Sequence, residues 1–247
     1  MRLCGEIMSL TPKDRLIFPL DFPSWKEAST YVRLLAGTVG VFKIGLELFI
    51  AEGPPILKKI REETEAGIFL DLKLHDIPET VKRALSVISE YGVDFVTIHC
   101  DAGRRLAGAI SIATGAGTKV LGVTLLTSIG RDDLAVQGLA GEFIDDVSRL
   151  VVQRAMAAGE AGCSGVISSG QEVKAIRERL GRDFLIVTPG IRPAWSVTPD
   201  DDQRRIVTPR EAILNGADYI VVGRPIRTAK DPIEAARRII EEIKQAS

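Results

Sequence analysis

Histidine and cysteine are scarce in this chain, and their scarcity limits the chemistry that it can carry. Among 247 residues there are only two histidines and three cysteines. Cys4, Cys100 and Cys163 lie far apart, their number is odd, and no C-x-x-C pair occurs. The sequence therefore predicts neither a disulfide framework nor a zinc site, and it indicates reduced thiols in a cytoplasmic protein.

Net charge and long apolar runs are also missing. The formal net charge is −1, which offers no electrostatic attraction for a nucleic acid or an anionic membrane. No uninterrupted apolar run approaches the roughly 18 residues that a transmembrane helix needs. The first eight residues are too few and too polar for the apolar core of a secretory signal. We expect no nucleic-acid partner and no membrane partner.

The beginning of the chain has no hydrophobic period. We therefore expect residues 1–15 to be an N-terminal extension and residues 16–247 to form one domain. Met8 is a second candidate for the true start. No linker or low-complexity segment divides the remainder.

Short apolar runs and helical patterns alternate along the rest of the chain. Eight runs read as strands: 16–21, 41–45, 67–72, 94–100, 119–126, 165–170, 184–192 and 218–224. Continuous apolar strands are typical of parallel sheets that are covered on both faces. Eight successive strand–helix units predict an α/β fold, the (β/α)8 TIM barrel. An open doubly wound sheet is the alternative, but no G-x-G-x-x-G follows the first strand and no P-loop appears.

Capping residues and prolines predict where several helices begin and end. We expect Ser24 and Thr208 to cap helices, Pro78 to occupy a first helical position, and a break at 53–55, where the sequence is Gly-Pro-Pro. The main predicted helices span 46–63, 78–91, 102–113, 142–158, 171–180 and 232–245. Two polar connections interrupt the pattern, a short helical insertion at 131–141 and a long loop at 193–205.

The stretch 69–80, with the sequence FLDLKLHDIPET, places three charges within six positions of a buried strand. On a regular strand Asp71 and Lys73 leave the same face, with Leu70, Leu72 and Leu74 on the other. Opposite charges on the inner face of a strand are costly unless they are paired or used. A lone D-x-K would indicate a structural salt bridge, but Asp76 and further polar residues favour a functional site.

Polar residues also follow the other predicted strands. In a barrel these positions meet at one end, where the sites of such folds lie. A single charge there could be a solvated loop residue. A ring of alternating charge at one end of the barrel is not what the requirements of stability alone would predict. The residues are Asp21, Lys43, Asp71, Lys73, Asp76, His99, Thr127, Ser128, Ser168, Arg192 and Arg224.

The last two strands carry the features of a phosphate site. Gly223 would let the backbone approach an oxyanion, and Arg192 and Arg224 could each make a charge-assisted contact. Loops after the seventh and eighth strands bind phosphate in many barrels. The alternative is a plain barrel rim without a ligand. Two adjacent loops that both contain glycine and arginine favour a phosphate site.

These residues together resemble a known family. D-x-K-x-x-D-I-P at 71–78 is similar to the signature of orotidine 5′-phosphate decarboxylases. So are Leu-Asp at 20–21, Phe-Lys-Ile-Gly at 42–45, Leu-Thr-Ser at 126–128, Thr-Pro-Gly-Ile-Arg at 188–192 and Val-Gly-Arg-Pro at 222–225. The similarity spans 16–232, and Asp-Gln-Arg-Arg at 202–205 resembles the bacterial branch of the family.

The resemblance implies decarboxylation of orotidine 5′-monophosphate to UMP in pyrimidine biosynthesis, without a metal or an organic cofactor. Lys73 would protonate C6 as carbon dioxide leaves, and Asp71 would lie against the substrate carboxylate. Lys43 and Asp76 would complete an alternating Lys-Asp-Lys-Asp array. In the family, the residues that match Asp76 and Thr80 reach into the neighbouring subunit's site, which implies a homodimer with shared active sites.

The same resemblance assigns the remaining contacts with the nucleotide. Asp21 and Lys43 would hold ribose hydroxyls, Thr127 the pyrimidine, and Ile77 would also line the substrate site. The residues expected at the phosphate are Arg192, Gln203, Gly223 and Arg224.

Two other functions remain open from the sequence. A Mg²⁺-dependent sugar-phosphate decarboxylase or aldolase would use the same charged triplet, with carboxylate ligands near the second strand. Glu47 lies one turn past Lys43, but Lys43 would place a positive charge where the cation would sit. A non-catalytic phosphate-binding barrel is the third possibility. We expect neither His75 nor His99 to be catalytic: His75 points away from Asp71 and Lys73 or into a loop, and His99 packs in the barrel mouth.

Overall fold

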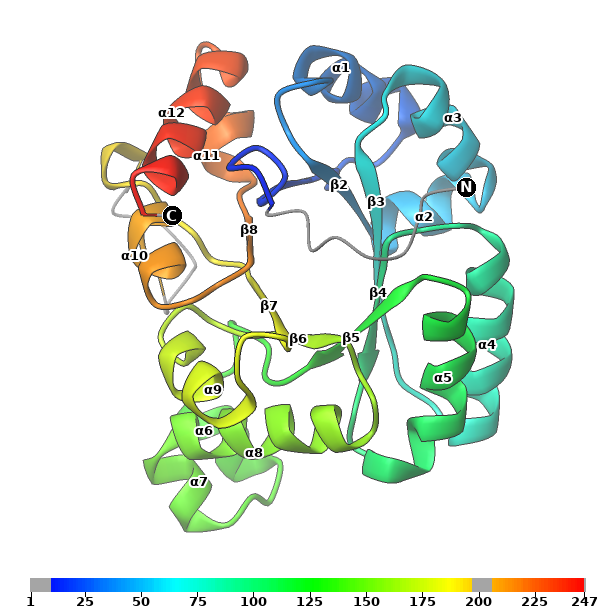
Figure 1. The fold of residues 1–247 in the computed structure, drawn as a ribbon, viewed down its shortest axis with the longest axis vertical. Helices are drawn as coiled ribbons and strands as arrows, with labels where there is room; N and C mark the ends of the chain where they lie inside the picture. Colours follow the sequence, from blue (N-terminus) through cyan, green and yellow to red (C-terminus); the bar gives the residue numbers. More distant parts are fainter. Residues whose placement is uncertain (1–9, 197–205, 247) are drawn as a thin grey trace.

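Eight parallel strands form a closed barrel surrounded by helices, which confirms the (β/α)8 prediction (Figure 1). The computed structural model describes residues 10–196 and 206–246. Each strand pairs with its neighbours in sequence, and β8 closes the ring against β1. The strands are β1 (Leu16–Pro19), β2 (Val41–Gly45), β3 (Gly67–Leu74), β4 (Phe95–His99), β5 (Lys119–Val123), β6 (Gly165–Ile167), β7 (Leu185–Thr188) and β8 (Tyr219–Val221).

The helices cover the outer face of the barrel (Figure 1). They are α1 (Trp25–Leu35), α2 (Leu46–Glu52), α3 (Pro55–Glu63), α4 (Pro78–Glu90), α5 (Ala107–Gly115), α6 (Arg131–Val136), α7 (Gly141–Asp145), α8 (Val147–Glu160), α9 (Val173–Leu180), α10 (Pro209–Leu214), α11 (Arg224–Arg227) and α12 (Pro232–Lys244), with short 3-10 turns at Gly103–Leu106 and Ala194–Ser196. Within the described ranges, no helix combines the length and the apolar character needed to cross a bilayer.

The predicted caps are confirmed. The Ser24 side chain accepts a hydrogen bond from the backbone of Glu27, and Thr208 forms a reciprocal capping box with Glu211. Pro78 occupies the first turn of α4. The predicted break after Gly53 separates α2 from α3, because a proline within a helix removes a backbone donor.

One predicted helix is wrong. Residues 142–158 do not form a continuous helix: α7 ends at Asp145 and α8 begins at Val147. Asp146 lies between them, and its carboxylate accepts a hydrogen bond from the backbone of Arg149. An aspartate that caps a new helix competes with continuation of the previous one. The insertion predicted at 131–141 contains α6.

The hydrophobic core has two layers. One lies inside the barrel and consists of Ile17, Val41, Phe69, Phe95, Leu121, Val187 and Tyr219. The larger layer lies between the strands and the helices and includes alternate strand residues such as Phe18, Phe42 and Leu70. Side chains alternate along each strand, so each strand contributes to both layers. The inner layer fills the barrel, as is usual for this fold.

Strand β3 departs from the predicted regular geometry. Its register with β4 runs from Phe69↔Phe95 to Leu70↔Val96, then shifts so that Leu74 faces Ile98. Lys73 has a φ of 48°, the only positive value at a non-glycine position in the described chain. Asp71 and Lys73 were expected to share a face because side chains alternate along a regular strand. Strand β3 is not regular between these residues, so that reason is wrong.

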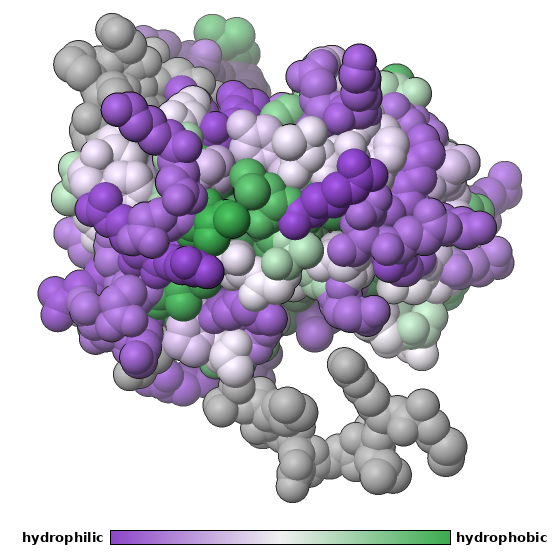
Figure 2. All heavy atoms as spheres, turned by 90° about the horizontal axis from the view of Figure 1, so that it is seen from above, coloured by the Kyte–Doolittle hydropathy of each residue, from purple (hydrophilic) through white to green (hydrophobic). Residues whose placement is uncertain are grey.

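The described part of the expected extension contacts the barrel. The Arg15 guanidinium donates to the backbone oxygens of Ala217 and Asp218, 2.6 and 3.0 Å away. Residues 1–9, which include Cys4 and Met8, lie outside the described residues. On the face seen in Figure 2, hydrophilic residues cover most of the surface and enclose a small hydrophobic area.

Candidate active site

A cavity of about 570 Å³ opens at the carboxyl ends of the strands. It receives side chains or backbone from β1, β2, β3, β5, β6 and β8 and from the segments that follow β1, β5, β7 and β8. Its lining residues are Pro19, Asp21, Lys43, Phe69, Asp71, Lys73, Val123, Leu125, Leu126, Thr127, Ile167, Pro189, Gly190, Arg192, Val221, Gly223, Arg224 and Arg227.

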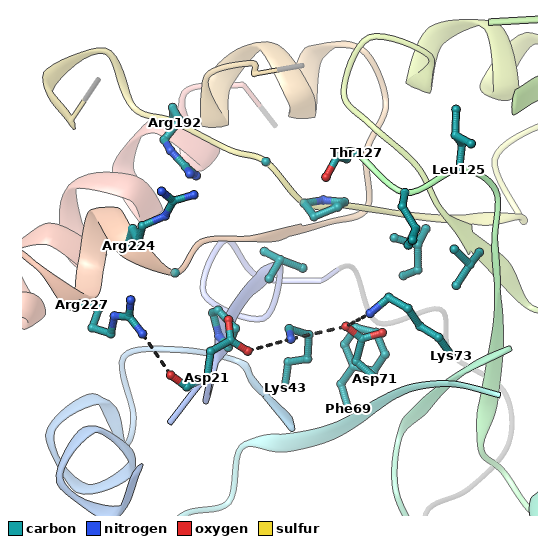
Figure 3. A pocket seen from close by; sticks show the side chains of 18 residues that line it. Asp21, Lys43, Phe69, Asp71, Lys73, Leu125, Thr127, Arg192, Arg224 and Arg227 are labelled. Carbon is teal, nitrogen blue, oxygen red and sulfur yellow. Dashed lines mark hydrogen bonds and ion pairs between the residues drawn. The ribbon is translucent and has the colours of Figure 1, made fainter. Parts of the chain in front are cut away.

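A chain of alternating charges crosses one side of this cavity (Figure 3). The Lys43 ammonium lies 3.2 Å from Oδ1 of Asp21 and 3.4 Å from Oδ2 of Asp71. The Lys73 ammonium lies 2.8 Å from the same Oδ2 of Asp71. Two lysines from neighbouring strands therefore converge on one carboxylate oxygen.

Asp71 is the centre of this network. Its burial raises the pKa of the carboxyl, as the largest single contribution. The ammonium groups of Lys43 and Lys73 act in the opposite direction, together with hydrogen bonds from Lys73 and Thr97. These contacts outweigh burial, so the pKa of Asp71 lies below its ordinary value. The group is a carboxylate at neutral pH.

Three arginines occupy the other side of the cavity (Figure 3). Arg192 follows β7 and is buried, with one guanidinium N–H donating to the backbone oxygen of Ile191. Arg224 and Arg227 lie in α11, directly after β8. Arg227 donates to the backbone oxygen of Asp21 at 3.0 Å. The described lining residues carry more positive than negative groups, which suits an anionic ligand.

Gly223 lies where the backbone of the β8 loop passes close to β1. A Cβ at this position would lie 2.9 Å from Cγ of Pro19. A side chain is thus excluded, and the backbone borders the cavity directly. Gly223 and Arg224 therefore lie together in the lining of the cavity, and their binding of phosphate stays a prediction.

Three predicted site residues do not line the cavity of this chain. Asp76, Ile77 and Thr80 are exposed, beyond the end of β3. One carboxylate oxygen of Asp76 accepts a hydrogen bond from the backbone of Ile77. Gln203 lies outside the described residues, as does most of the 193–205 loop. Thr127 does line the cavity, beside Leu125 and Leu126 (Figure 3).

The two histidines lie together next to this site. Their ring centroids are 5.0 Å apart, and Nε2 of His75 is 3.1 Å from Oδ2 of Asp101. Burial lowers the pKa of His99, and the opposing effect of Asp101 does not compensate. Neither histidine lines the cavity. That both are non-catalytic stays a prediction.

The donor set does not favour a divalent cation. In the described ranges, no group of three or more His, Cys, Asp and Glu side chains is arranged to hold a metal ion. The only carboxylates that line the cavity there are Asp21 and Asp71, and the Lys43 ammonium bridges them. Glu47 is exposed and does not line the cavity.

Sequence reasoning missed several residues of the site. Phe69 and Pro19 line the cavity but carry no chemical signal in the sequence. Arg227 lies one helical turn after Arg224, a spacing that could have been read as a shared helix face. Thr97 binds Asp71 and the Lys73 backbone, and it looked like an ordinary strand threonine.

Comparisons with known proteins agree with this geometry. The family model described as "Orotidine 5'-phosphate decarboxylase / HUMPS family" matches residues 14–239. An orotidine 5′-phosphate decarboxylase of Desulfosudis oleivorans is 50% identical over 241 residues, covering 97% of each chain. One from Gloeothece citriformis is 45% identical over 233 residues, covering 93% of this chain and 97% of the relative.

Solved structures show the same similarity. The orotidine 5′-phosphate decarboxylase of Lactobacillus acidophilus matches with a TM-score of 0.79 and 35% identity, covering 92% of this chain and 98% of that one. The one from Pyrococcus horikoshii matches with a TM-score of 0.72 and 26% identity, covering 93% and 99%.

Proposed function

Because this chain belongs to the orotidine 5′-phosphate decarboxylase / HUMPS family and decarboxylates orotidine 5′-phosphate to UMP in pyrimidine biosynthesis, we propose that Lys73 supplies the proton that replaces carbon dioxide. The supporting observation is the convergence of the Lys43 and Lys73 ammonium groups on one oxygen of Asp71. Two ammonium groups beside one carboxylate place positive charge at a fixed point of the cavity.

The decarboxylation requires a positive charge fixed beside the reacting carbon. When the bond between C6 and the carboxylate breaks, its electron pair stays on C6 as carbon dioxide leaves. No neighbouring carbonyl can delocalise that pair as an enolate. The Lys73 ammonium stabilises the developing charge and then transfers a proton to C6. The neutral amine regains a proton from solvent after the product leaves.

Asp71 holds the lysines in place and also faces the substrate. A carboxylate beside two ammonium groups restricts the rotamers of both lysine side chains. In our proposal the substrate carboxylate enters near Asp71, where like charge favours its departure. The depressed pKa of Asp71 keeps that negative charge at neutral pH.

The arginine side of the cavity would bind the phosphate. Arg192 and Arg224 offer guanidinium groups, and the Gly223 backbone approaches without a side chain. Gln203 is proposed as a further ligand on the basis of the family resemblance alone. Binding energy from this remote group orients the pyrimidine at Lys73 and so contributes to the rate.

The sugar and base would lie between the two ends of the cavity. We propose that Asp21 and Lys43 hold the ribose hydroxyls and that Thr127 contacts the pyrimidine. All three line the cavity, between the arginines and Lys73 (Figure 3). In this orientation the nucleotide spans from α11 to the end of β3.

We propose that the reaction needs no metal or organic cofactor. The Lys43 ammonium occupies the position between Asp21 and Asp71 that a divalent cation would need. The test is loss of orotidylate absorbance by the purified chain, with and without EDTA. We expect the same rate in both conditions. A rate abolished by EDTA and restored by Mg²⁺ would support the metal-dependent alternative, and no turnover in either would refute the activity.

Exposed residues beyond β2 and β3 suggest how a dimer would form. Leu46 and Ile50 lie one turn apart on α2 and are 50% and 78% exposed, and Ile77 is 67% exposed. α2 and Ile77 follow the carboxyl ends of the neighbouring strands β2 and β3, so these side chains lie towards the end of the barrel where the cavity opens. We propose a homodimer through this surface, with Asp76, Ile77 and Thr80 of each subunit completing the partner's site.

Mixing two inactive variants tests the shared site. Lys73→Ala and Asp76→Ala are each expected to lose turnover. If Asp76 acts across the interface, mixed dimers regain one intact site, and random exchange restores about a quarter of the wild-type activity. No recovery, in a mixture shown by native mass spectrometry to contain mixed dimers, would place Asp76 in its own subunit's site or outside the mechanism.

We place the enzyme in the cytoplasm. Cys100 and Cys163 are both free cysteines, as expected in a reducing compartment. Fractionation of the native cells tests this location. Recovery of the chain with the membrane or the exported fraction would contradict it.

A further inference from the structure

The bulge in β3 brings the proposed proton donor and its carboxylate opposite a single residue of β4. Leu70 faces Val96 and Leu74 faces Ile98, so the three residues from Asp71 to Lys73 lie opposite Thr97 alone. Bulges beside active sites commonly re-aim a side chain. Here the bulge spans Asp71 and Lys73 themselves.

Thr97 is bonded to both ends of the bulge. Its hydroxyl donates to Oδ1 of Asp71 at 2.9 Å and accepts the backbone N–H of Lys73, also at 2.9 Å. The side chain is fully buried, so water does not compete for these bonds. The hydroxyl uses its one proton for the carboxylate and a lone pair for the amide, and each bond polarises the other.

The backbone of Lys73 needs such a partner. Its φ of 48° lies in the left-handed region, which is unfavourable for a residue with a Cβ. In a regular strand the N–H of Lys73 would point to the same side as that of Gly67, which donates to the backbone oxygen of Gly40 just before β2. Here the bulge turns the N–H to Thr97 of β4, where a side-chain oxygen accepts it. Strain of this kind persists only where the surroundings fix it.

The contacts with Asp71 complete a closed arrangement. Thr97 binds one carboxylate oxygen, while the Lys73 ammonium binds the other at 2.8 Å. The backbone of Lys73 and its ammonium are thus both fixed relative to the same carboxylate. Removing the hydroxyl would release the N–H and one carboxylate oxygen together.

We propose that Thr97 is a positioning residue for proton transfer, because its hydroxyl holds Lys73 in the left-handed conformation that aims the ammonium at the reacting carbon. This inference rests on the proposed role of Lys73. Thr97 need not touch the substrate, since it acts through Lys73 and Asp71. Its effect should fall on the chemical step more than on nucleotide binding.

The test compares three variants in steady-state orotidylate decarboxylation, together with UMP binding by calorimetry. Thr97→Val keeps the shape and removes the hydroxyl, and Thr97→Ser keeps the hydroxyl. Thr118→Val is the matched control, since Thr118 is also buried and donates only to the backbone oxygen of Val93. It removes a buried hydroxyl away from the cavity.

We expect Thr97→Val to lower kcat by about 10- to 100-fold, the cost of misplacing a reacting group by a fraction of an ångström or more. KM and the UMP dissociation constant should change by less than about threefold. Thr97→Ser should recover kcat to within about threefold of wild type. Thr118→Val should leave kcat unchanged even where its melting temperature falls.

Three results would overturn the inference. They are a wild-type kcat in folded Thr97→Val, a Thr97→Ser variant as slow as Thr97→Val, or an equal loss of kcat in Thr118→Val. A wild-type chain that does not decarboxylate orotidylate would instead remove the proposed function, so the two failures are distinguishable.

Amide exchange gives a readout that does not require Thr97→Val to fold. In the wild-type chain and in Thr97→Ser, the Lys73 amide should exchange slowly because it is bonded to a buried oxygen. Exchange at the rate of an exposed amide in either protein would show that the hydroxyl does not hold it, and would overturn the inference.

Discussion

The two ends of the barrel carry similar charged groups in different arrangements. At the amino ends of the strands, the Arg177 guanidinium binds Asp218 at 2.7 Å. It also donates to the backbone oxygens of Gly181, Phe184 and Gly216. At the carboxyl ends, the lysines bind Asp71 and Asp21 and face a cavity. One end fastens the chain to itself, and the other presents charge to a ligand.

Exposure follows the same division. The Arg177 side chain is 14% exposed, whereas that of Lys73 is 30% exposed although it ends beside a buried carboxylate. Arg177 joins α9 to the segments before β7 and β8 through its planar group of donors. Lys73 could form three hydrogen bonds, and one is to Asp71. We therefore interpret a partly buried ion pair as part of a reactive site when its donor groups also line a cavity.

Replacing Lys73 should have the largest effect and should separate the two ends most clearly. We expect Lys73→Ala to lower kcat by about 10⁴-fold or more, because it removes both the proton donor and the charge at C6. The free energy of unfolding should change by less than about 1 kcal/mol, since Asp71 keeps Lys43 and Thr97. Steady-state assays and urea denaturation measure the two quantities.

Lys58→Ala is the control for that experiment, because Lys58 is exposed on α3 and pairs only with Glu62 in the described chain. Its kcat should match wild type. A Lys73→Ala enzyme with near-wild-type kcat would remove Lys73 from the mechanism.

Replacing Arg177 should have the opposite effect, a loss of stability with little change in kcat. We expect Arg177→Ala to lower the free energy of unfolding by about 3 kcal/mol, because it removes the cation beside Asp218 and the guanidinium donor of several backbone oxygens. The kcat of the folded fraction should stay within twofold of wild type. Arg179→Ala, an exposed arginine on the same helix, should change neither quantity. A large fall in kcat for Arg177→Ala would show that the two ends are coupled.

Replacing an arginine that lines the cavity should lower the affinity for the substrate. We expect Arg224→Ala to raise KM by about 10- to 100-fold, the effect of losing a charge-assisted hydrogen bond to phosphate. Arg237→Ala, an exposed arginine on α12, serves as the control and should leave KM unchanged. An Arg224→Ala enzyme with the wild-type KM would refute the phosphate assignment.

The smallest expected effect concerns His99 and the pH dependence of stability. Burial lowers the pKa of His99 in the folded chain, so the unfolded chain takes up a proton first as the pH falls. Stability should therefore fall as the pH drops below about 6.5, the ordinary histidine value, and the loss is complete below the folded pKa. In thermal melts, His99→Gln should show a smaller decrease in melting temperature over this range. An unchanged slope would contradict the assignment.

Much of this arrangement could be predicted from the sequence. Alternating apolar runs and helical patterns predict the barrel, and the fold then brings Asp21, Lys43 and Asp71 to one end. Capping residues such as Thr208 predict helix boundaries because they satisfy backbone groups nearby in the sequence.

Other features depend on contacts between distant segments. The bulge in β3 cannot be read from 67–74, because the Lys73 amide within it is bonded to a hydroxyl 24 residues further along the chain. The contact between Arg227 and the backbone oxygen of Asp21 joins residues 206 positions apart. Neither partner carries a sequence signal for the other.

A crystal structure of this chain with UMP would show whether Lys73 faces the reacting carbon. We expect the Lys73 ammonium about 3 to 3.5 Å from C6 of the pyrimidine, with the phosphate at Arg192 and Arg224. A nucleotide bound with its phosphate at Lys73, or with C6 beyond reach of that ammonium, would contradict this expectation.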